Sequence, residues 1–134
     1  MKYLLDTNIC IAIIKDCPAE VKEKLEQTAI GEVAISSVVL AELCYGIELS
    51  SKQKQNREAL DNFLQYATVL DWPEKAGIEY GSIRAFLKGR GTPIGANDLL
   101  VAAHALAIDA TLVSDNTREF QRVPGLRLEN WITR

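Results

Sequence analysis

Four acidic residues occur where a buried strand should end or where an apolar helix should begin. Asp6 follows the apolar stretch YLL, and Asp115 follows the stretch TLVS. Glu42 lies within the apolar run SSVVLAELCYG, and Asp98 lies at the start of NDLLVAAHAL. A carboxylate in such surroundings is costly to bury without a partner. These positions are therefore candidates for chemistry.

Carboxylates that converge at one place repel each other and raise one another's pKa values. A hard divalent cation removes that conflict, since Mg²⁺ and Mn²⁺ prefer oxygen ligands and Mg²⁺ usually keeps several waters. Such a cation can lower the pKa of a bound water and stabilise charge on a phosphate during in-line displacement. The pattern thus predicts metal-assisted hydrolysis of a phosphodiester.

Three of these positions also have a simpler explanation. Asp98 could cap its helix or interact with the helix dipole. Glu42 could reach solvent at the edge of its helix. Asp6 could cap the helix that follows it, although Thr7 and Asn8 are expected to provide that cap and to orient the Asp6 carboxylate.

Residues other than these acids give weaker evidence for a catalytic or metal-binding site. The single histidine, His104, is predicted to be a satisfied core or interface residue, and the three scattered cysteines lack the spacing of a zinc site. No P-loop, G-x-G-x-x-G or G-x-S-x-G motif occurs. Two basic clusters near Asp98 and Asp115 could follow a nucleic-acid backbone or could simply be solvated surface charge. They comprise Arg84, Lys88 and Arg90, and Arg118, Arg122 and Arg127.

The elements that must position the acids alternate between short apolar strands and helices. Strands are predicted at 2–6, 33–36, 67–71, 111–114 and 128–132, and helices at 8–16, 18–28, 38–49, 54–66, from 73 to the loop at 89, and 97–108. This alternation predicts an α/β domain with a parallel sheet flanked by helices. In such sheets, ligands bind outside the carboxyl ends of the strands, where these acids are expected.

Length and composition agree with one domain spanning 1–134. The chain has 134 residues, 48% of them hydrophobic, and a formal net charge of -3, which excludes a strongly basic protein. No apolar run approaches the ~20 residues of a membrane span, and no secretory signal is evident, so a cytoplasmic location is expected.

Four stretches together resemble a known family. LLDTNICI, ISSVVLAELCYG, GTPIGANDLLVAAHAL and LVSDNTREFQRVPGL look like the PIN-domain ribonucleases, in the family's order, and more narrowly like the VapC-type toxins of type II toxin–antitoxin pairs. The resemblance implies a Mg²⁺- or Mn²⁺-dependent endoribonuclease that inhibits translation. It also implies a homodimer and a small VapB-type antitoxin, with DNA bound only through the antitoxin.

The resemblance places the first three family acids on Asp6, Glu42 and Asp98, with Asp6 and Asp98 as principal metal ligands. The fourth position falls on Asn116, so Asp115, Asn116 or Glu119 could supply the fourth group of the site. The PIGANDL and TREF stretches look most like a subgroup that cuts initiator tRNA in the anticodon stem-loop.

Two other functions remain open from the sequence. The Asp-Thr-Asn that follows the first strand superficially resembles the opening of haloacid-dehalogenase phosphatases, which need a second Asp where this chain has Asn8. Alternatively, the domain could bind RNA or a protein without cutting.

Overall fold

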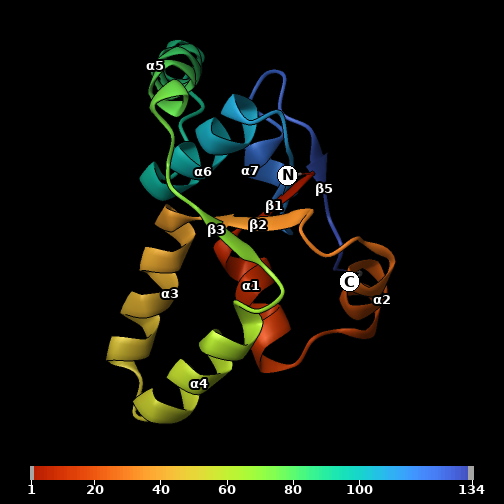
Figure 1. Ribbon diagram of the computed structural model, residues 1–134. Helices are drawn as coiled ribbons and strands as arrows, with labels where there is room; N and C mark the ends of the chain where they lie inside the picture. Colours follow the sequence, from red (N-terminus) through yellow and green to blue (C-terminus); the bar gives the residue numbers. More distant parts are fainter. Residues whose placement is uncertain (1, 133–134) are drawn as a thin grey trace.

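Short apolar stretches form five parallel strands at the centre of the computed structural model, which describes residues 2–132. The strands are β1 (Tyr3–Leu5), β2 (Val33–Ser36), β3 (Thr68–Leu70), β4 (Thr111–Val113) and β5 (Leu128–Glu129). They are ordered β3-β2-β1-β4-β5, and every neighbouring pair is parallel. The predicted α/β class with a parallel sheet is confirmed (Figure 1).

Helices cover both faces of this sheet. In the view of Figure 1, α5 and α6 lie above the sheet, whereas α1 and α4 lie below it. The helices are α1 (Thr7–Lys15), α2 (Ala19–Gln27), α3 (Ser37–Leu49), α4 (Gln53–Phe63), α5 (Glu74–Gly89), α6 (Ala96–Ala107) and α7 (Thr117–Phe120). No helix within residues 2–132 is long and apolar enough to cross a membrane.

Strands β1 and β2 each lead directly into a helix. The residue at each junction, Asp6 before α1 and Ser36 before α3, caps the helix that follows. Oδ1 of Asp6 accepts a hydrogen bond from the backbone N–H of Ile9 at 3.0 Å, and Oγ of Ser36 accepts one from Val38 at 3.2 Å. These bonds satisfy backbone donors that the first helical turn leaves free. The prediction that Thr7 or Asn8 caps the first helix is therefore wrong, because α1 begins one residue earlier than expected.

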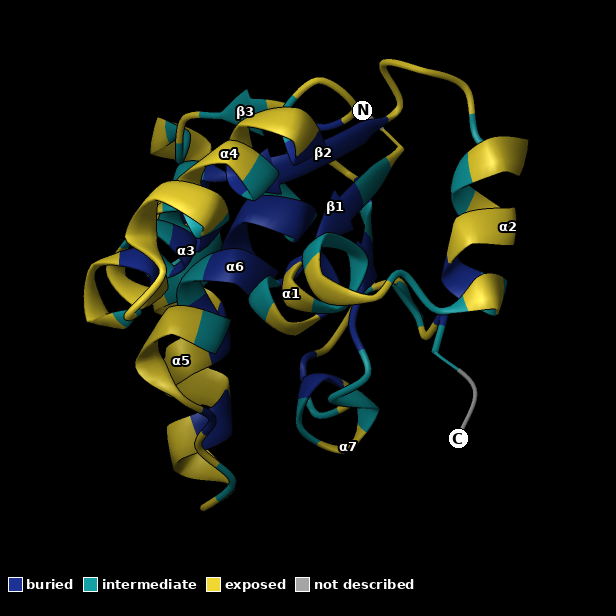
Figure 2. Cartoon of the chain, turned by 90° about the horizontal axis from the view of Figure 1, so that it is seen from below, coloured by how far each residue is buried: buried dark blue, intermediate teal, exposed yellow. Residues whose placement is uncertain are grey.

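The apolar helix that carries Asp98 is buried, as its sequence predicts. Val101, Ala102, Ala103 and Ala105 of α6 are almost fully enclosed, and α6 is largely dark in Figure 2, whereas the outer faces of α2, α4 and α5 are exposed. The small alanine side chains allow α6 to pack closely against its neighbouring helices and strands.

Several predicted boundaries change. The helix expected over 54–66 ends at Phe63, and the strand expected over 128–132 is limited to Leu128–Glu129. The short helix α7 was not predicted, because four residues are too few to establish a helical period.

Only Cys10 of the three free cysteines is fully buried.

Candidate active site

Asp6 lies at the centre of the carboxyl edge of the sheet. The backbone N–H of Asp6 donates a hydrogen bond to the carbonyl of Val113 at 3.0 Å. Asp6 is buried, with only 5% of its surface exposed. Burial raises the pKa of Asp6 from 3.8 to about 6; hydrogen bonds from the Ser114 side chain and the Ile9 backbone oppose this rise, while the charges of Asp115 and Asp98 add to it. A carboxylate held this way carries unfavourable free energy that a bound cation would relieve.

Glu42 is held near Asp6 by a residue adjacent to Asp6 in the chain. Oγ1 of Thr7 donates a hydrogen bond to Oε1 of Glu42 at 3.0 Å, joining the start of α1 to α3 across 35 positions. Glu42 is half-buried, and its charge contributes to raising the pKa of Asp98. The sequence predicted that Thr7 would orient Asp6; in the structure its hydroxyl orients Glu42 instead.

Asp98 occupies the first turn of α6, where a carboxylate also interacts favourably with the helix dipole. Burial raises its pKa, and the charges of Glu119 and then Glu42 raise it further. A Cβ atom at the N-cap residue, Gly95, would lie 3.6 Å from Oδ2 of Asp98. A side chain at position 95 would therefore touch this carboxylate at ordinary van der Waals distance.

The three candidates for the fourth position lie at the start of α7 and just before it. The backbone N–H of Asn116 donates to Oγ of Ser114 at 2.9 Å, and the Asn116 side-chain amide donates to Oε2 of Glu119 at 3.2 Å. The negative charge of Asp115 acts on Asp6, whereas that of Glu119 is the largest charge effect on Asp98. Asn116 thus orients Glu119 and contributes no charge itself.

We use the name acidic cluster for the five residues brought together here: Asp6, Glu42, Asp98, Asp115 and Glu119. In the described part of the chain, no lysine or arginine forms a salt bridge with Asp6, Glu42 or Asp98. No three acidic, cysteine or histidine side chains there are grouped closely enough to chelate one ion by themselves. The all-oxygen donor set fits Mg²⁺ or Mn²⁺ with several retained waters better than it fits a fully protein-enclosed ion.

Two interactions in this region were not anticipated from the sequence. Ser114 is fully buried and hydrogen-bonds both to Asp6 and to the backbone of Asn116. Thr7 hydrogen-bonds to Glu42. Hydroxyl residues adjacent to Asp6 and to Asp115 in the sequence were the available signal, but the partner of each hydroxyl depends on long-range packing.

The single histidine takes no part in the acidic cluster. His104 is fully buried in α6, and neither ring nitrogen has a hydrogen-bond partner within the structure described. Burial lowers the pKa of His104, so the ring is neutral at physiological pH. The predicted core location is correct, but the expectation of a satisfied side chain is wrong.

The basic residues near the cluster have different local roles. Arg122, just after α7, donates to the carbonyl of Pro93 at 3.2 Å and so ties this segment to the loop that precedes α6. Arg127 forms an ion pair with Asp109 at 2.9 Å. Arg84 donates to the Tyr80 hydroxyl at 2.7 Å and remains exposed. The predicted nucleic-acid contacts of these residues stay a prediction.

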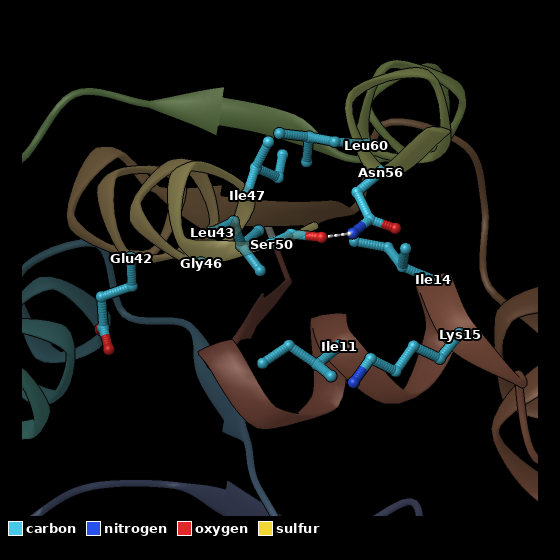
Figure 3. Close-up of a pocket in the computed structure, with 10 residues that line it drawn as sticks. All are labelled: Ile11, Ile14, Lys15, Glu42, Leu43, Gly46, Ile47, Ser50, Asn56 and Leu60. Carbon is cyan, nitrogen blue, oxygen red and sulfur yellow. Dashed lines mark hydrogen bonds between the residues drawn. The ribbon is translucent and has the colours of Figure 1, made fainter. Parts of the chain in front are cut away.

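An apolar groove adjoins the acidic cluster (Figure 3). It lies between α1, α3 and α4, and Glu42 stands at one end of it. Ile14, Ile47 and Leu60 supply apolar lining, with Lys15 at the rim. The groove thus offers apolar contacts next to a carboxylate of the candidate site.

The parallel α/β fold and the acidic cluster at the carboxyl edge of its sheet define the class of protein. The family model described as PIN domain matches residues 3–126. The chain is 48% identical over 132 residues to "Ribonuclease VapC2" of Rickettsia felis, covering 98% of each protein. It is 44% identical over 131 residues to "tRNA(fMet)-specific endonuclease VapC" of Shigella flexneri, again covering 98% of each.

Solved structures agree. The chain superposes on VapBC2 from Rickettsia felis, crystallised with a DNA fragment from its promoter, with a TM-score of 0.94 and 47% identity over 98% of this chain and 100% of that one. DNA-bound VapBC from Salmonella typhimurium gives a TM-score of 0.94 at 39% identity over 98% of this chain and 99% of that one. The chain belongs to the VapC ribonucleases of the PIN-domain family. Ribonucleases of this family are generally dependent on divalent metals. This membership argues against the haloacid-dehalogenase interpretation and favours a nuclease over a non-catalytic domain.

Substitutions at Asp115, Asn116 and Glu119 should separate the three candidates for the fourth group. Glu119→Gln is expected to reduce RNA cleavage about 10- to 100-fold, because its charge is coupled to Asp98. Asn116→Ala should have a smaller effect, since it frees Glu119 without removing it. Cleavage rates of the purified variants at fixed Mn²⁺ test this ranking. A larger loss in Asp115→Asn than in Glu119→Gln would instead assign the role to Asp115.

Proposed function

We propose that this chain is the toxin of a type II toxin–antitoxin pair and cuts tRNA with the help of Mg²⁺ or Mn²⁺. The observation that carries the metal proposal is the acidic cluster itself. Burial raises the pKa values of Asp6 and Asp98, and the charges of neighbouring acids in the cluster raise them further. No basic side chain of residues 2–132 forms a salt bridge with Asp6, Glu42 or Asp98. A bound divalent cation would supply the positive charge that stabilises the ionised carboxylates.

Within this proposal, each acidic residue has a distinct task. Asp6 and Asp98 are the principal metal ligands, one at the end of β1 and one in the first turn of α6. Glu42, oriented by Thr7, and Glu119, oriented by Asn116, hold ligand waters or orient the attacking water. When bound, the cation supplies an activated water and charge stabilisation at the phosphate.

The RNA substrate is inferred from relatives. Proteins of Shigella flexneri and Salmonella typhimurium that are 44% and 40% identical to this chain are named as tRNA(fMet)-specific endonucleases. We infer that this chain also cuts initiator tRNA in the anticodon stem-loop, which stops translation in the cytoplasm. Arg118 is exposed on α7 next to Glu119, and we infer that it contacts the RNA backbone near the cut.

The partners are also part of the proposal. The similar structures are complexes with VapB, and we infer a VapB-type antitoxin, a homodimer of this chain, and DNA contact only through the antitoxin. The groove beside Glu42 supports the antitoxin proposal, since an apolar segment seated there would lie next to the catalytic acids.

Sequencing of RNA ends tests the substrate directly. The purified chain is incubated with total bacterial RNA and Mn²⁺, with an Asp98→Asn variant as the matched control. The expected result is one dominant new end, in the initiator tRNA anticodon stem-loop, that the control lacks. A dominant cut in another tRNA or in ribosomal RNA would retain the ribonuclease but overturn the proposed substrate.

A further inference from the structure

Trp72 links the two helices that carry Glu42 and Asp98. It follows β3 and hydrogen-bonds to both helices through different atoms. Its backbone N–H donates to Oγ of Ser37, the first residue of α3, at 3.1 Å. Its indole Nε1–H donates to the carbonyl oxygen of Leu100 in α6 at 2.8 Å.

The positions of these acceptors connect Trp72 to the acidic cluster. Leu100 is two residues after Asp98, about 3 Å farther along α6, and Ser37 is five residues before Glu42, about 7.5 Å along α3. The carbonyl of Leu100 has a second lone pair, so it can accept the indole N–H in addition to a bond within its helix. Trp72 therefore joins α3 to α6 close to both carboxylates.

The indole itself is held in a defined orientation. Trp72 packs edge-on against Tyr80 of α5, with ring centroids 6.5 Å apart and an interplanar angle of 79°. The Tyr80 hydroxyl in turn accepts a hydrogen bond from Arg84 at 2.7 Å. A ring fixed by an aromatic neighbour and by a directional hydrogen bond constrains the helix it contacts more than an aliphatic side chain would.

We propose that Trp72 is a positioning residue that sets the separation of the Glu42 and Asp98 carboxylates and thereby the affinity of the site for its divalent cation. This inference rests on the proposed metal-binding role of the acidic cluster. Trp72 has no contact with RNA or metal in this scheme. It acts by fixing how α3 docks against α6.

The test compares the two tryptophans of the chain. Trp72→Phe keeps an aromatic ring and removes the indole donor. Trp131→Phe is the matched control, because Trp131 also donates through its indole, to Glu129 at 3.0 Å, and also packs edge-on against a tyrosine, Tyr3 at 5.2 Å. Mn²⁺ binding is measured by calorimetry at a temperature where circular dichroism shows both variants folded.

The Kd for Mn²⁺ is expected to rise about 10-fold in Trp72→Phe and to change less than about twofold in Trp131→Phe. The Mn²⁺ concentration needed for half-maximal cleavage should rise in parallel, while the rate at saturating Mn²⁺ stays near that of the wild type. Wild-type Mn²⁺ affinity in Trp72→Phe, or an equal loss in both variants, would overturn the inference.

Two further outcomes are informative. If Trp72→Phe does not fold, Ser37→Ala removes the other hydrogen bond, and an unchanged Mn²⁺ affinity in that variant would also overturn the inference. If the wild-type chain binds no Mn²⁺, the metal-binding role proposed for the acidic cluster fails, independently of Trp72.

Discussion

Asp6→Asn is expected to be more stable than the wild-type chain and to cut RNA at least about 10³-fold more slowly. The loss of activity follows from the removal of a principal metal ligand. The gain in stability follows because burial of the charged carboxylate raises the pKa of Asp6 from 3.8 to about 6. Asparagine removes the charge and can still cap α1, since Asn and Asp are comparable N-caps.

The gain in the free energy of unfolding of Asp6→Asn depends on pH. A rise in pKa from 3.8 to about 6 corresponds to roughly 3 kcal/mol at neutral pH, which sets the upper end of an expected gain of about 1–3 kcal/mol. The folded state binds the proton more tightly than the unfolded chain, so the wild type loses stability as pH rises from about 4 to 6. The advantage of Asp6→Asn should therefore be absent below pH 4, grow up to about pH 6 and then stay level.

Denaturant unfolding in EDTA at several pH values measures the stability difference, and cleavage of a defined RNA measures the activity. Asp61→Asn is the matched control, because Asp61 is an exposed acid on α4 and should change neither quantity. Cleavage at the wild-type rate by Asp6→Asn would falsify the ligand assignment. If Asp6→Asn is inactive but less stable than the wild type, the ligand assignment stands and the electrostatic explanation of stability is contradicted.

Removal of divalent cations by EDTA is expected to stop RNA cleavage by the wild-type chain, and excess Mn²⁺ or Mg²⁺ should restore it. Asp98→Asn should not recover under the same conditions, since it lacks the second principal ligand. Because the pKa of Asp6 is about 6, the cation must displace a proton at lower pH. Its apparent affinity should fall about 10-fold for each pH unit below 6 and change little above 7.

Calorimetric titration with Mn²⁺ at pH 5, 6, 7 and 8 checks this dependence, with proton release measured in buffers of different ionisation enthalpy. Undiminished cleavage in EDTA would show that the acidic cluster works without a metal. An affinity that is independent of pH would show instead that Asp6 is not a direct ligand.

The sequence alone was sufficient to bring Asp6, Glu42 and Asp98 into one hypothesis. Each breaks an apolar stretch, and such local patterns report which positions face a core. The strands of a parallel sheet end at a common edge, so residues far apart in the chain could be expected together there. The same logic correctly predicted a buried α6 and an α/β domain.

The arrangement within the site was decided only by tertiary structure. Thr7 pairs with Glu42 rather than capping α1, and α7 directs Glu119 toward Asp98 while Asp115 acts on Asp6. Trp72 reaches both α3 and α6. These partners depend on the docking of whole helices, whose angles and distances come from the summed packing of many side chains. The sequence therefore determined which residues are candidates for chemistry, and the packing of the helices on the sheet decided how they are paired.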